Sequence, residues 1–161
     1  LGNRSILCDP RDINIKDILN RKVKKRESFR PFAPTVLKEK ASEYFDIGID
    51  SPYMLMVVKV KRDKRDIIPG VTHVDGTARI QTVTKKQNST FYRLIEEFEK
   101  ITKVPVLLNT SFNIRGEPIV EKPTDALNTF IKTGIDLLFL EHFLIEKDEK
   151  IGDEIQLKIV S

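Results

Sequence analysis

Short apolar blocks separated by one long amphipathic segment constrain the fold of this chain more than any other feature. The segment 89–102 repeats its apolar side chains every three or four residues, which is the period of a helix with one apolar face. These side chains are Phe91, Leu94, Ile95, Phe98 and Ile101. Asn88 directly precedes the segment and predicts its N-cap. We therefore expect a helix over 89–102 that packs on a sheet.

Three apolar blocks are too short for helices and predict strands. They cover 53–60, 78–83 and 104–108. The first is rich in Met, Leu and Val, so we expect it to be a buried strand. Because strands and helices alternate and several connections are short, the chain predicts an α/β fold, with a twisted open mixed sheet and flanking helices.

The remaining elements follow from caps and breakers. Asp12 is a candidate N-cap for a helix of about 14–23, and a short helix is expected around 38–44. Another helix is expected over 124–133, with Gly134 as its left-handed terminator. Strand-like pieces at 136–145 and 155–160 complete the prediction.

Charge and composition bound the class of protein. The 28 basic and 24 acidic residues leave a net charge of +4, concentrated in the basic segment 21–30, which predicts an affinity for phosphate groups. The longest apolar runs are far below the roughly 20 residues that a bilayer requires, so no membrane partner is expected. A lone Cys8 excludes an internal disulfide framework and favours a cytoplasmic setting. Since the sequence opens on Leu1 without a signal pattern, we expect a fragment whose N-terminal partner is missing.

The first candidate site segment is cationic. Lys24, Arg26 and Arg30 lie at the end of the expected helix and on the proline-rich segment after it. A triphosphate needs several cations held at fixed angles, and Pro31 and Pro34 stiffen the backbone that carries Arg30. The alternative is that these side chains face water and complement the helix dipole.

The second segment, 72–79, places hydroxyl, imidazole, carboxylate and guanidinium groups around one glycine. Its candidates are His73, Asp75, Thr77 and Arg79. An ordinary turn with a structural histidine would use the same residue types.

The third segment, 109–113, follows an apolar strand and is expected to be a loop. Its candidates are Asn109, Thr110, Ser111 and Asn113. Ligands collect beyond the carboxyl ends of strands in open α/β sheets, although a plain strand terminator favours the same residues. Glu117 is expected to balance Arg115. No glycine-rich phosphate loop occurs, so a phosphate site must be built from side chains.

The three segments together resemble the C-terminal domain of O-carbamoyltransferases that modify antibiotics and nodulation factors. The matching text is Leu1-Gly-Asn-Arg-Ser-Ile-Leu, Val23-Lys-Lys-Arg-Glu-Ser-Phe-Arg-Pro-Phe-Ala-Pro34, Val71-Thr-His-Val-Asp-Gly-Thr-Ala-Arg-Ile-Gln-Thr-Val83 and Pro105-Val-Leu-Leu-Asn-Thr-Ser-Phe-Asn113. It covers 1–147, which we expect to be one domain, with 148–161 as a C-terminal tail or edge strand. The resemblance implies a YrdC/Sua5-like fold that binds ATP through Lys-x-Arg and Ser-x-Asn motifs.

The resemblance also implies an activity. In the family this domain forms carbamoyl adenylate from carbamoyl phosphate and ATP, with Mg²⁺ as a helper. An N-terminal Kae1-like domain, which supplies its own metal site, then passes the carbamoyl group to an acceptor hydroxyl. The residues implied as catalytic are Lys24, Arg30, Arg79 and Ser111. The residues implied as nucleotide- or phosphate-binding are these four together with Arg26, Thr77, Thr110 and Asn113. Further candidates are His73, Asp75 and Asn109. No metal ligand is expected in this chain.

Two other functions fit parts of the sequence. The sequence pI of about 9.1 and the basic segment fit a nucleic-acid-binding module without catalysis. Nucleic acid is nevertheless not our expected partner, because the chain has no Trp and does not interleave aromatic with basic residues. The third possibility is a scaffold for the N-terminal domain.

Overall fold

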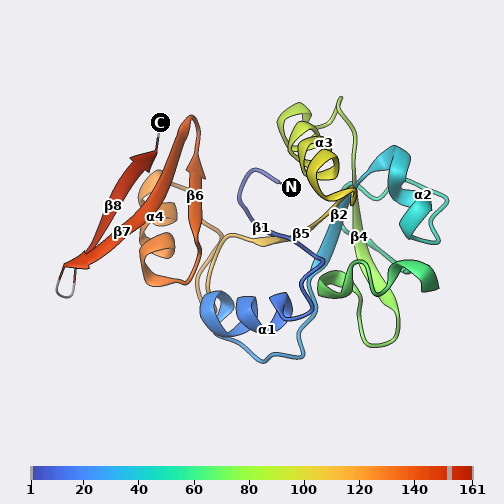
Figure 1. The fold of residues 1–161 in the computed structure, drawn as a ribbon, viewed down its shortest axis with the longest axis horizontal. Coiled ribbons are helices and arrows are strands. Elements are labelled where there is room, and N and C mark those ends of the chain that lie inside the picture. The colour runs from blue at the N-terminus through green and yellow to red at the C-terminus, as the bar shows by residue number, and fades with distance from the viewer. Residues whose placement is uncertain (1, 152–153, 161) are drawn as a thin grey trace. The chain divides into compact units, whose positions relative to one another are not determined.

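The computed structural model describes residues 2–151 and 154–160, which divide into two compact units (Figure 1). The first unit contains Leu1–Asp17 and Ser28–Ser111, and the second contains Ile18–Glu27 and Phe112–Ser161. Among the described residues, no helix combines the length and apolarity needed to cross a bilayer.

A five-stranded mixed sheet forms the first unit. The mixed sheet was predicted, but its strands Ser5–Cys8 and Ala33–Leu37 were not. Its order is β1-β5-β2-β4-β3, with β2 and β4 parallel and the other neighbours antiparallel. The strands are β1 (Ser5–Cys8), β2 (Ala33–Leu37), β3 (Met56–Lys59), β4 (Thr77–Val83) and β5 (Val106–Ser111). The chain is therefore a mixed α/β protein.

Helix α3 (Ser89–Thr102) covers one face of this sheet and confirms the prediction for 89–102. The Asn88 side chain accepts a 3.0 Å hydrogen bond from the Phe91 amide, as expected of an N-cap. Sheet and helix share a core cluster of Leu37, Val83, Phe91, Ile95 and Leu107. The apolar face of α3 is only partly buried, because Ile101 near the C-terminal end of the helix is 82% exposed.

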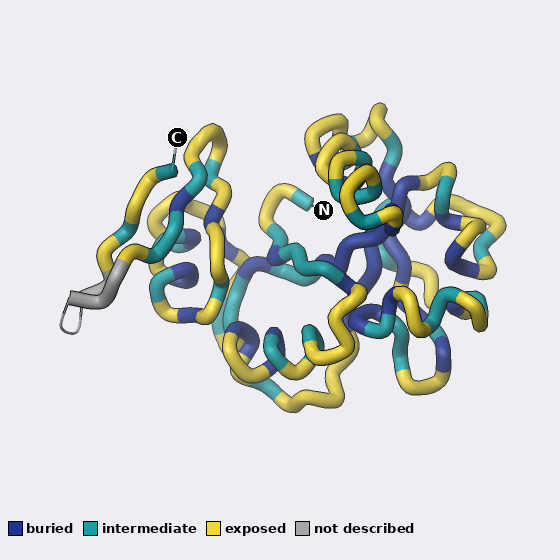
Figure 2. Tube along the Cα trace, viewed as in Figure 1, coloured by how far each residue is buried: buried dark blue, intermediate teal, exposed yellow. Residues whose placement is uncertain are grey.

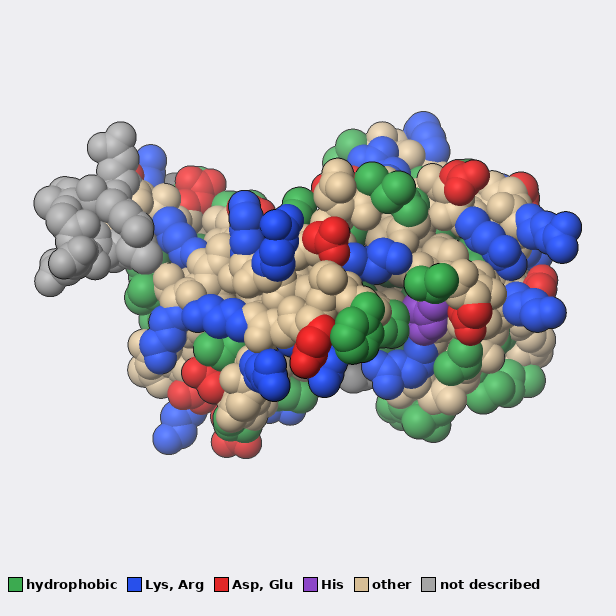
Figure 3. Space-filling view, turned by 90° about the horizontal axis from the view of Figure 1, so that it is seen from below, with side chains coloured by type: hydrophobic (Ala, Val, Ile, Leu, Met, Phe, Trp, Pro, Cys, Tyr) green, Lys and Arg blue, Asp and Glu red, His purple; other side chains and the backbone are tan. Residues whose placement is uncertain are grey.

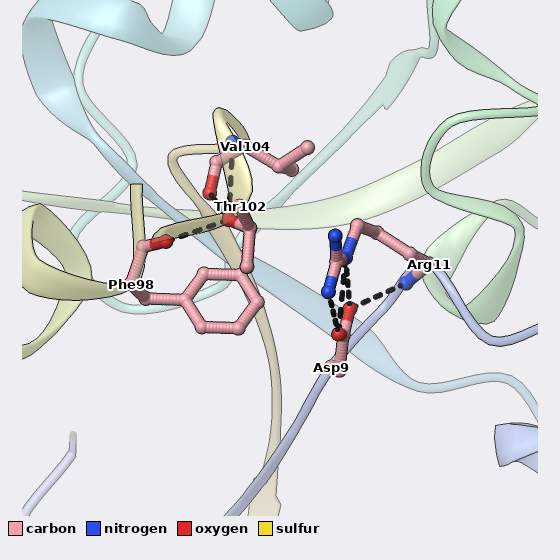
Figure 4. A network of polar contacts seen from close by, with 5 residues as sticks. All are labelled: Asp9, Arg11, Phe98, Thr102 and Val104. Atoms are coloured by element: carbon pink, nitrogen blue, oxygen red, sulfur yellow. Dashed lines mark hydrogen bonds and ion pairs between the residues drawn. The ribbon is translucent and has the colours of Figure 1, made fainter. Parts of the chain in front are cut away.

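The chain leaves α3 through a hydrogen-bonded turn shown in Figure 4. Lys103 takes the left-handed conformation (φ 64°), and the Thr102 hydroxyl donates to the Phe98 carbonyl at 2.6 Å. Nearby, Asp9 and Arg11 form a forked ion pair of 2.6–3.0 Å, and the guanidinium lies 5.8 Å from the centre of the Phe98 ring. These contacts join the segment after β1 to the end of α3.

Short helical pieces make up most of the connections in the first unit. They are α1 (Ile15–Ile18), whose last residue lies in the second unit, η2 (Lys38–Lys40), α2 (Ala41–Tyr44), η3 (Arg62–Lys64) and η4 (Pro69–Val71). The η2 and α2 turns realise the helix predicted at 38–44. Strand residues that point away from α3, such as Val36, Ile80 and Leu108, are fully buried (Figure 2).

The prediction of a buried strand at 53–60 is wrong. The strand β3 is only Met56–Lys59 and lies at the edge of the sheet, where it pairs with β4 alone. Tyr53, Leu55 and Val57 are 70%, 80% and 60% exposed. An apolar composition predicts a strand, but burial requires neighbours on both faces, and an edge strand lacks them.

The second unit contains a three-stranded antiparallel sheet and one helix. The sheet has the order β6-β7-β8, with β6 (Leu137–Leu140), β7 (Phe143–Ile151) and β8 (Glu154–Val160). Helix α4 (Pro123–Lys132) contacts β6, and its Phe130 is fully buried. The helix predicted over 124–133 and the strand predicted at 155–160 are present. The single piece predicted at 136–145 is instead parts of two strands, because β6 ends at Leu140 and β7 begins at Phe143.

Two details of this region differ from the prediction. The helix expected over 14–23 is α1 followed by a π-helical segment, η1 (Leu19–Lys24). Gly134 does not terminate α4 in a left-handed conformation, since the cap is Thr133 with φ −122°. Gly134 instead allows a close approach, because an added Cβ would lie 3.0 Å from the Lys22 Cβ.

Candidate functional site

Strand register brings most of the candidate residues together at one end of the strands of the first sheet, where β5 ends. Ser5 pairs with Ser111 and Ala33 pairs with Asn109, so β1 and β2 begin where β5 ends. Because β4 is parallel to β2, Thr77 also begins its strand at this edge. We call the set Arg30, His73, Asp75, Thr77, Arg79, Thr110 and Ser111 the polar edge; Arg30 precedes β2 by three residues.

Arg79 and Ser111 leave the same face of the sheet. Side chains alternate along a strand, so Arg79 shares its face with Val83, and Ser111 shares its face with Leu107. Val83 and Leu107 both pack in the α3 core cluster. Arg79 is exposed and Ser111 half-buried, whereas Thr110 points to the opposite face. Two residues predicted from separate segments are therefore brought to one face.

The predicted loop 109–113 is in part strand, because β5 continues to Ser111. Asn109 is 2% exposed and its Nδ2 donates to Thr35 Oγ1 at 3.1 Å and to Gln81 Oε1 at 2.9 Å. Thr35 Oγ1 also donates to Gln81 Oε1 at 2.7 Å. This buried polar triad links β2, β4 and β5. Thr35 and Gln81 were not predicted from the sequence, although Gln81, as a polar residue inside an apolar strand block, was a visible signal.

The turn before β4 is built by Asp75. Its Oδ1 accepts hydrogen bonds from the Thr77 amide at 3.0 Å and the Thr77 hydroxyl at 2.7 Å, which lower the pKa of the carboxyl. Gly76 has φ +76°, a conformation that favours glycine. Asp75 thus has the turn-forming role that the sequence left open as its alternative.

His73 lies on a cleft of 410 Å³ at the polar edge. The cleft is lined by Lys16, Phe29, Pro31, His73, Val74 and Asp75. Burial lowers the pKa of His73, Asp75 opposes this shift, and the charges of Lys16 and Arg79 add to it. Figure 3 shows one face of the molecule, on which cationic, acidic and hydrophobic side chains lie beside a histidine. Lys16, whose Nζ donates to the Thr72 carbonyl at 3.0 Å, was missed by the sequence analysis.

A second polar cluster lies in the second unit. Lys24 Nζ donates to Asn113 Oδ1 at 2.9 Å and to the Asn113 carbonyl at 3.1 Å. Asn113 Nδ2 donates in turn to the Glu117 carbonyl at 2.8 Å, so both ends of the amide are engaged. Lys24 is 4% exposed, and burial, followed by the charge of Arg26, lowers its pKa to about 8. The Lys-Lys-Arg and Ser-Phe-Asn segments, which are far apart in sequence, therefore meet.

Arg26 is held by Asn20, which sequence reasoning did not identify. The Arg26 Nε donates to Asn20 Oδ1 at 2.8 Å, and its amide donates to the Asn20 carbonyl at 3.0 Å. Arg115 pairs with Glu27 at 3.9 Å, so the expected balance of Arg115 by Glu117 is wrong. The carbonyl of Glu117 contributes to the Lys24 cluster instead.

The two clusters belong to different units, and each is established by itself. Arg30, Arg79 and Ser111 lie in the first unit, whereas Lys24 and Asn113 lie in the second. Their convergence on one anion stays a prediction. Among residues 2–151 and 154–160, no group of three or more His, Cys, Asp or Glu side chains could hold a metal ion.

Comparison with known proteins identifies the family. The "Carbamoyltransferase C-terminus" family matches residues 1–147. Nodulation protein NolO of Bradyrhizobium diazoefficiens is 50% identical over 150 residues, which cover 91% of this chain and 27% of NolO. Nodulation protein NolNO of Sinorhizobium fredii is 52% identical over 151 residues, covering 91% of this chain and 22% of NolNO.

A further relative, Nodulation protein U of Azorhizobium caulinodans, is 44% identical over 116 residues, covering 72% of this chain and 20% of that protein. The chain thus spans 20–27% of the length of these three relatives. With the family match extending over 1–147, the chain belongs to the carbamoyltransferase C-terminus family.

Proposed function

We propose that this chain binds ATP and carbamoyl phosphate and forms carbamoyl adenylate as part of an O-carbamoyltransferase. One carbamoyl phosphate, one ATP and one water would yield carbamoyl adenylate, phosphate and diphosphate. A carbamate oxygen bonds to the α-phosphorus of ATP as the α–β anhydride bond breaks. The family and the polar clusters support this proposal.

The direct contact between Lys24 and Asn113 carries the proposal. The Lys24 ammonium is held in a fixed place by two acceptors, at 2.9 and 3.1 Å, inside a largely buried environment. A desolvated, pre-positioned cation stabilises negative charge on a phosphate more strongly than a mobile surface lysine does. Asn113 therefore positions Lys24. We also predict that Asn113 contacts the ligand directly.

The polar edge would supply the remaining charge. Arg79 stands on a paired strand, so its guanidinium starts from a rigid base, and Arg30 precedes β2 on a proline-flanked segment. Ser111 would donate a hydroxyl hydrogen bond to a phosphate oxygen, with Thr77, Arg26 and Thr110 as further contacts. No covalent nucleophile is required, because positioning and charge stabilisation account for the reaction.

The transfer step would belong to another part of a longer protein. Relatives that match this chain are about four times its length. We propose that an N-terminal Kae1-like domain, with its own metal, passes the carbamoyl group to an acceptor hydroxyl and releases AMP.

Calorimetric titration of the chain with ATP and with carbamoyl phosphate tests the proposal. Lys24→Ala and Arg79→Ala should each weaken binding by about 100-fold, the loss expected for a charge-assisted phosphate contact. Lys38→Ala is the matched control, because Lys38 forms an exposed ion pair with Asp50 at 2.7 Å. Unchanged affinity in both site variants, with folded protein, would refute the proposal.

The two alternative functions give different results in the same titrations. A nucleic-acid-binding module should bind single-stranded RNA with affinity that falls steeply as salt increases. ATP binding should depend less on salt and more on Mg²⁺. A scaffold should show no shift of melting temperature with either ligand.

A further inference from the structure

One edge of the first sheet, formed by β3, presents apolar side chains to solvent. Strand β3 pairs with β4 alone, and Leu55 and Val57 are 80% and 60% exposed. Tyr53 and Ile49, in the segment before β3, are 70% and 62% exposed. The opposite edge strand of the sheet, β1, contains no exposed residue. The sheet therefore has one covered edge and one open apolar edge, and we call residues 53–58 the β3 edge.

Main-chain groups of β3 point alternately toward β4 and away from it. The Val60 amide donates to the carbonyl of Gly76, directly before β4, at 2.9 Å, so even-numbered residues face β4. Odd-numbered residues face outward, as the 2.9 Å hydrogen bond from the Asp46 amide to the Lys59 carbonyl shows. Val57 lies two residues before Lys59, and its main-chain groups therefore point to the outer side of the sheet.

The β3 edge lacks the features that usually prevent a strand from pairing with another chain. Residues 55–58 contain neither a charged residue nor a proline, and the register with β4 runs from Met56 to Lys59 without a bulge. Charged, proline-containing or bulged edges resist strand addition, whereas a flat apolar edge accepts it. At Lys59 the outer side is already occupied by the segment at Asp46. The space for an added strand is therefore limited to the residues before Lys59.

The charges on either side of the β3 edge favour a second copy of the chain as the added strand. Segment 46–53 contains two acidic and no basic residues, and segment 59–62 contains three basic and no acidic residues. These charged residues are Asp46, Asp50, Lys59, Lys61 and Arg62. Within one copy, Asp50 pairs with Lys38 at 2.7 Å, which offsets part of the acidic charge. In an antiparallel pair of identical strands, each acidic flank lies beside the basic flank of the other copy, so the charges complement each other at both ends.

We propose that two copies of the chain pair antiparallel through β3, with Val57 of each copy opposite Leu55 of the other. Each opposed pair would exchange its outward main-chain hydrogen bonds, and the apolar side chains of both copies would cover one another. The two five-stranded sheets would then form one continuous sheet. Each copy has one β3 edge, so a two-fold contact uses both edges and closes at the dimer.

The dimer does not depend on the proposed nucleotide chemistry, but its contact lies next to the polar edge. Val57 pairs directly with Arg79 on β4, so these two side chains leave the same face of the sheet. Dimerisation would therefore place the Arg79 residues of both copies on one continuous sheet. The β3 edge is smaller than the roughly 20–30 residues per partner of a standard interface, so we expect a dissociation constant in the micromolar range.

Sedimentation velocity of the whole chain, from about 1 to 500 μM, tests the dimer, because a micromolar equilibrium changes from monomer to dimer over that range. Val57→Lys places a charge at the centre of the contact and should weaken dimerisation about tenfold. Ile101→Lys is the matched control, since it introduces the same charge at an 82% exposed apolar residue of α3, and it should dimerise as the wild type does.

Three results of this experiment would overturn the proposal. A chain that stays monomeric at every concentration refutes the dimer and leaves the β3 edge to a contact with a different protein segment. Species larger than a dimer refute the two-fold contact. Equal weakening by Val57→Lys and Ile101→Lys would show that the contact does not involve β3.

Opposite charge reversals test the antiparallel arrangement. Arg62→Glu and Asp50→Lys should each weaken the dimer about fivefold, because like charges then face each other on both flanks. An equimolar mixture of the two variants should dimerise as the wild type does, since each reversed charge again meets one of opposite sign. A mixture that associates no more strongly than the separate variants would contradict antiparallel pairing.

Amide hydrogen exchange separates strand pairing from a contact of side chains alone. The Val57 amide points outward and should become more protected as the protein concentration rises through the dissociation constant. The Val58 amide faces β4 at every concentration and is the internal control, whose protection should stay the same. A dimer in which exchange of the Val57 amide does not depend on concentration would refute pairing through β3.

Discussion

Arg79 and Lys24 are two cations positioned by opposite means. Arg79 is exposed on a hydrogen-bonded strand, where its charge stays hydrated and only the backbone is rigid. Lys24 is 4% exposed and held by Asn113, and its pKa falls to about 8. Burial thus makes Lys24 costly to charge before any ligand arrives. The Arg79 guanidinium is therefore hydrated but not fixed by burial, whereas the Lys24 ammonium is fixed in place but desolvated.

The largest expected effect tests whether Asn113 supports the buried charge. Asn113→Ala removes the Oδ1 acceptor from Lys24 and should lower the free energy of unfolding by about 2–3 kcal/mol, because a buried charged donor loses a partner. Chemical denaturation at pH 7 measures it. Arg79→Ala, at an exposed position, should stay within about 0.5 kcal/mol. Equal losses in the two variants would remove the distinction between the regions.

The turn that leads into Arg79 should be the next most sensitive position. Gly76→Ala puts a side chain at φ +76° and brings its Cβ within 2.4 Å of the Arg65 guanidinium carbon. We expect a loss of about 1–2 kcal/mol, mainly from backbone strain, since the end of Arg65 can move aside. Thermal denaturation measures the change.

Two variants separate the causes in that turn. Gly48→Ala is the control, because nothing lies within 4 Å of its added Cβ. Combining Gly76→Ala with Arg65→Ala should leave most of the loss in place. Full recovery in the double variant would show that the contact with Arg65, and not the φ angle, causes the loss.

The low pKa of Lys24 predicts proton uptake when a phosphate ligand binds. At pH 8.5 a group with a pKa of about 8 is mostly neutral, and a nearby anion raises its pKa, so binding should take up a fraction of a proton. Affinity should therefore decrease as the pH rises above 8. Calorimetry in buffers of different ionisation enthalpy measures the uptake, and Lys24→Met should abolish it. Uptake that persists in Lys24→Met would assign the proton to another group.

The same shift has a consequence for folding. The folded pKa of Lys24 lies below its ordinary value of 10.5, so between pH 8 and 10.5 the unfolded chain binds more protons. The unfolding free energy of the wild type should rise relative to that of Lys24→Met over this range. The charge penalty is fully present below pH 8.

The smallest expected effect concerns an exposed pair of the second unit. Arg115 and Glu27 lie 3.9 Å apart with side chains 67% and 41% exposed. Arg115→Ala should change the free energy of unfolding by less than about 0.5 kcal/mol, because water screens such pairs. Denaturation at low and high salt checks this value. A loss comparable to that of Asn113→Ala would mean that burial does not determine how much a polar contact contributes to the free energy of unfolding.

Local signals allowed much of the fold to be predicted. The helix 89–102 was found with its cap because its periodicity and Asn88 act within a few residues of each other. The edge position of β3 was not predictable, since Tyr53, Leu55 and Val57 have the composition of a buried strand. The π-helical segment η1 and the close approach at Gly134 depend on contacts that no local pattern encodes.

The candidate site divides in the same way. Arg79, Ser111 and Lys24 could be predicted from the sequence, because their side chains are of types that bind phosphate. The contact of Asn113 with Lys24 and that of Asn109 with Gln81 could not be predicted, because each joins distant segments of the chain. The contact of Asn20 with Arg26 is local, but it depends on the π-helical turn between them, which the sequence did not predict. Asp75 could be read either as a ligand or as a turn residue, and its hydrogen bonds to Thr77 favour the turn.

The sequence by itself determined the helix 89–102, the strands near 78–83 and 104–108, the mixed α/β class and the three polar segments, because periodicity, caps and residue chemistry are local properties. Tertiary structure alone decided which strand lies at an edge, which polar residues share a face of the sheet, and that burial lowers the pKa of Lys24. These depend on which neighbours exclude water from a side chain, and pairing between distant strands chooses those neighbours.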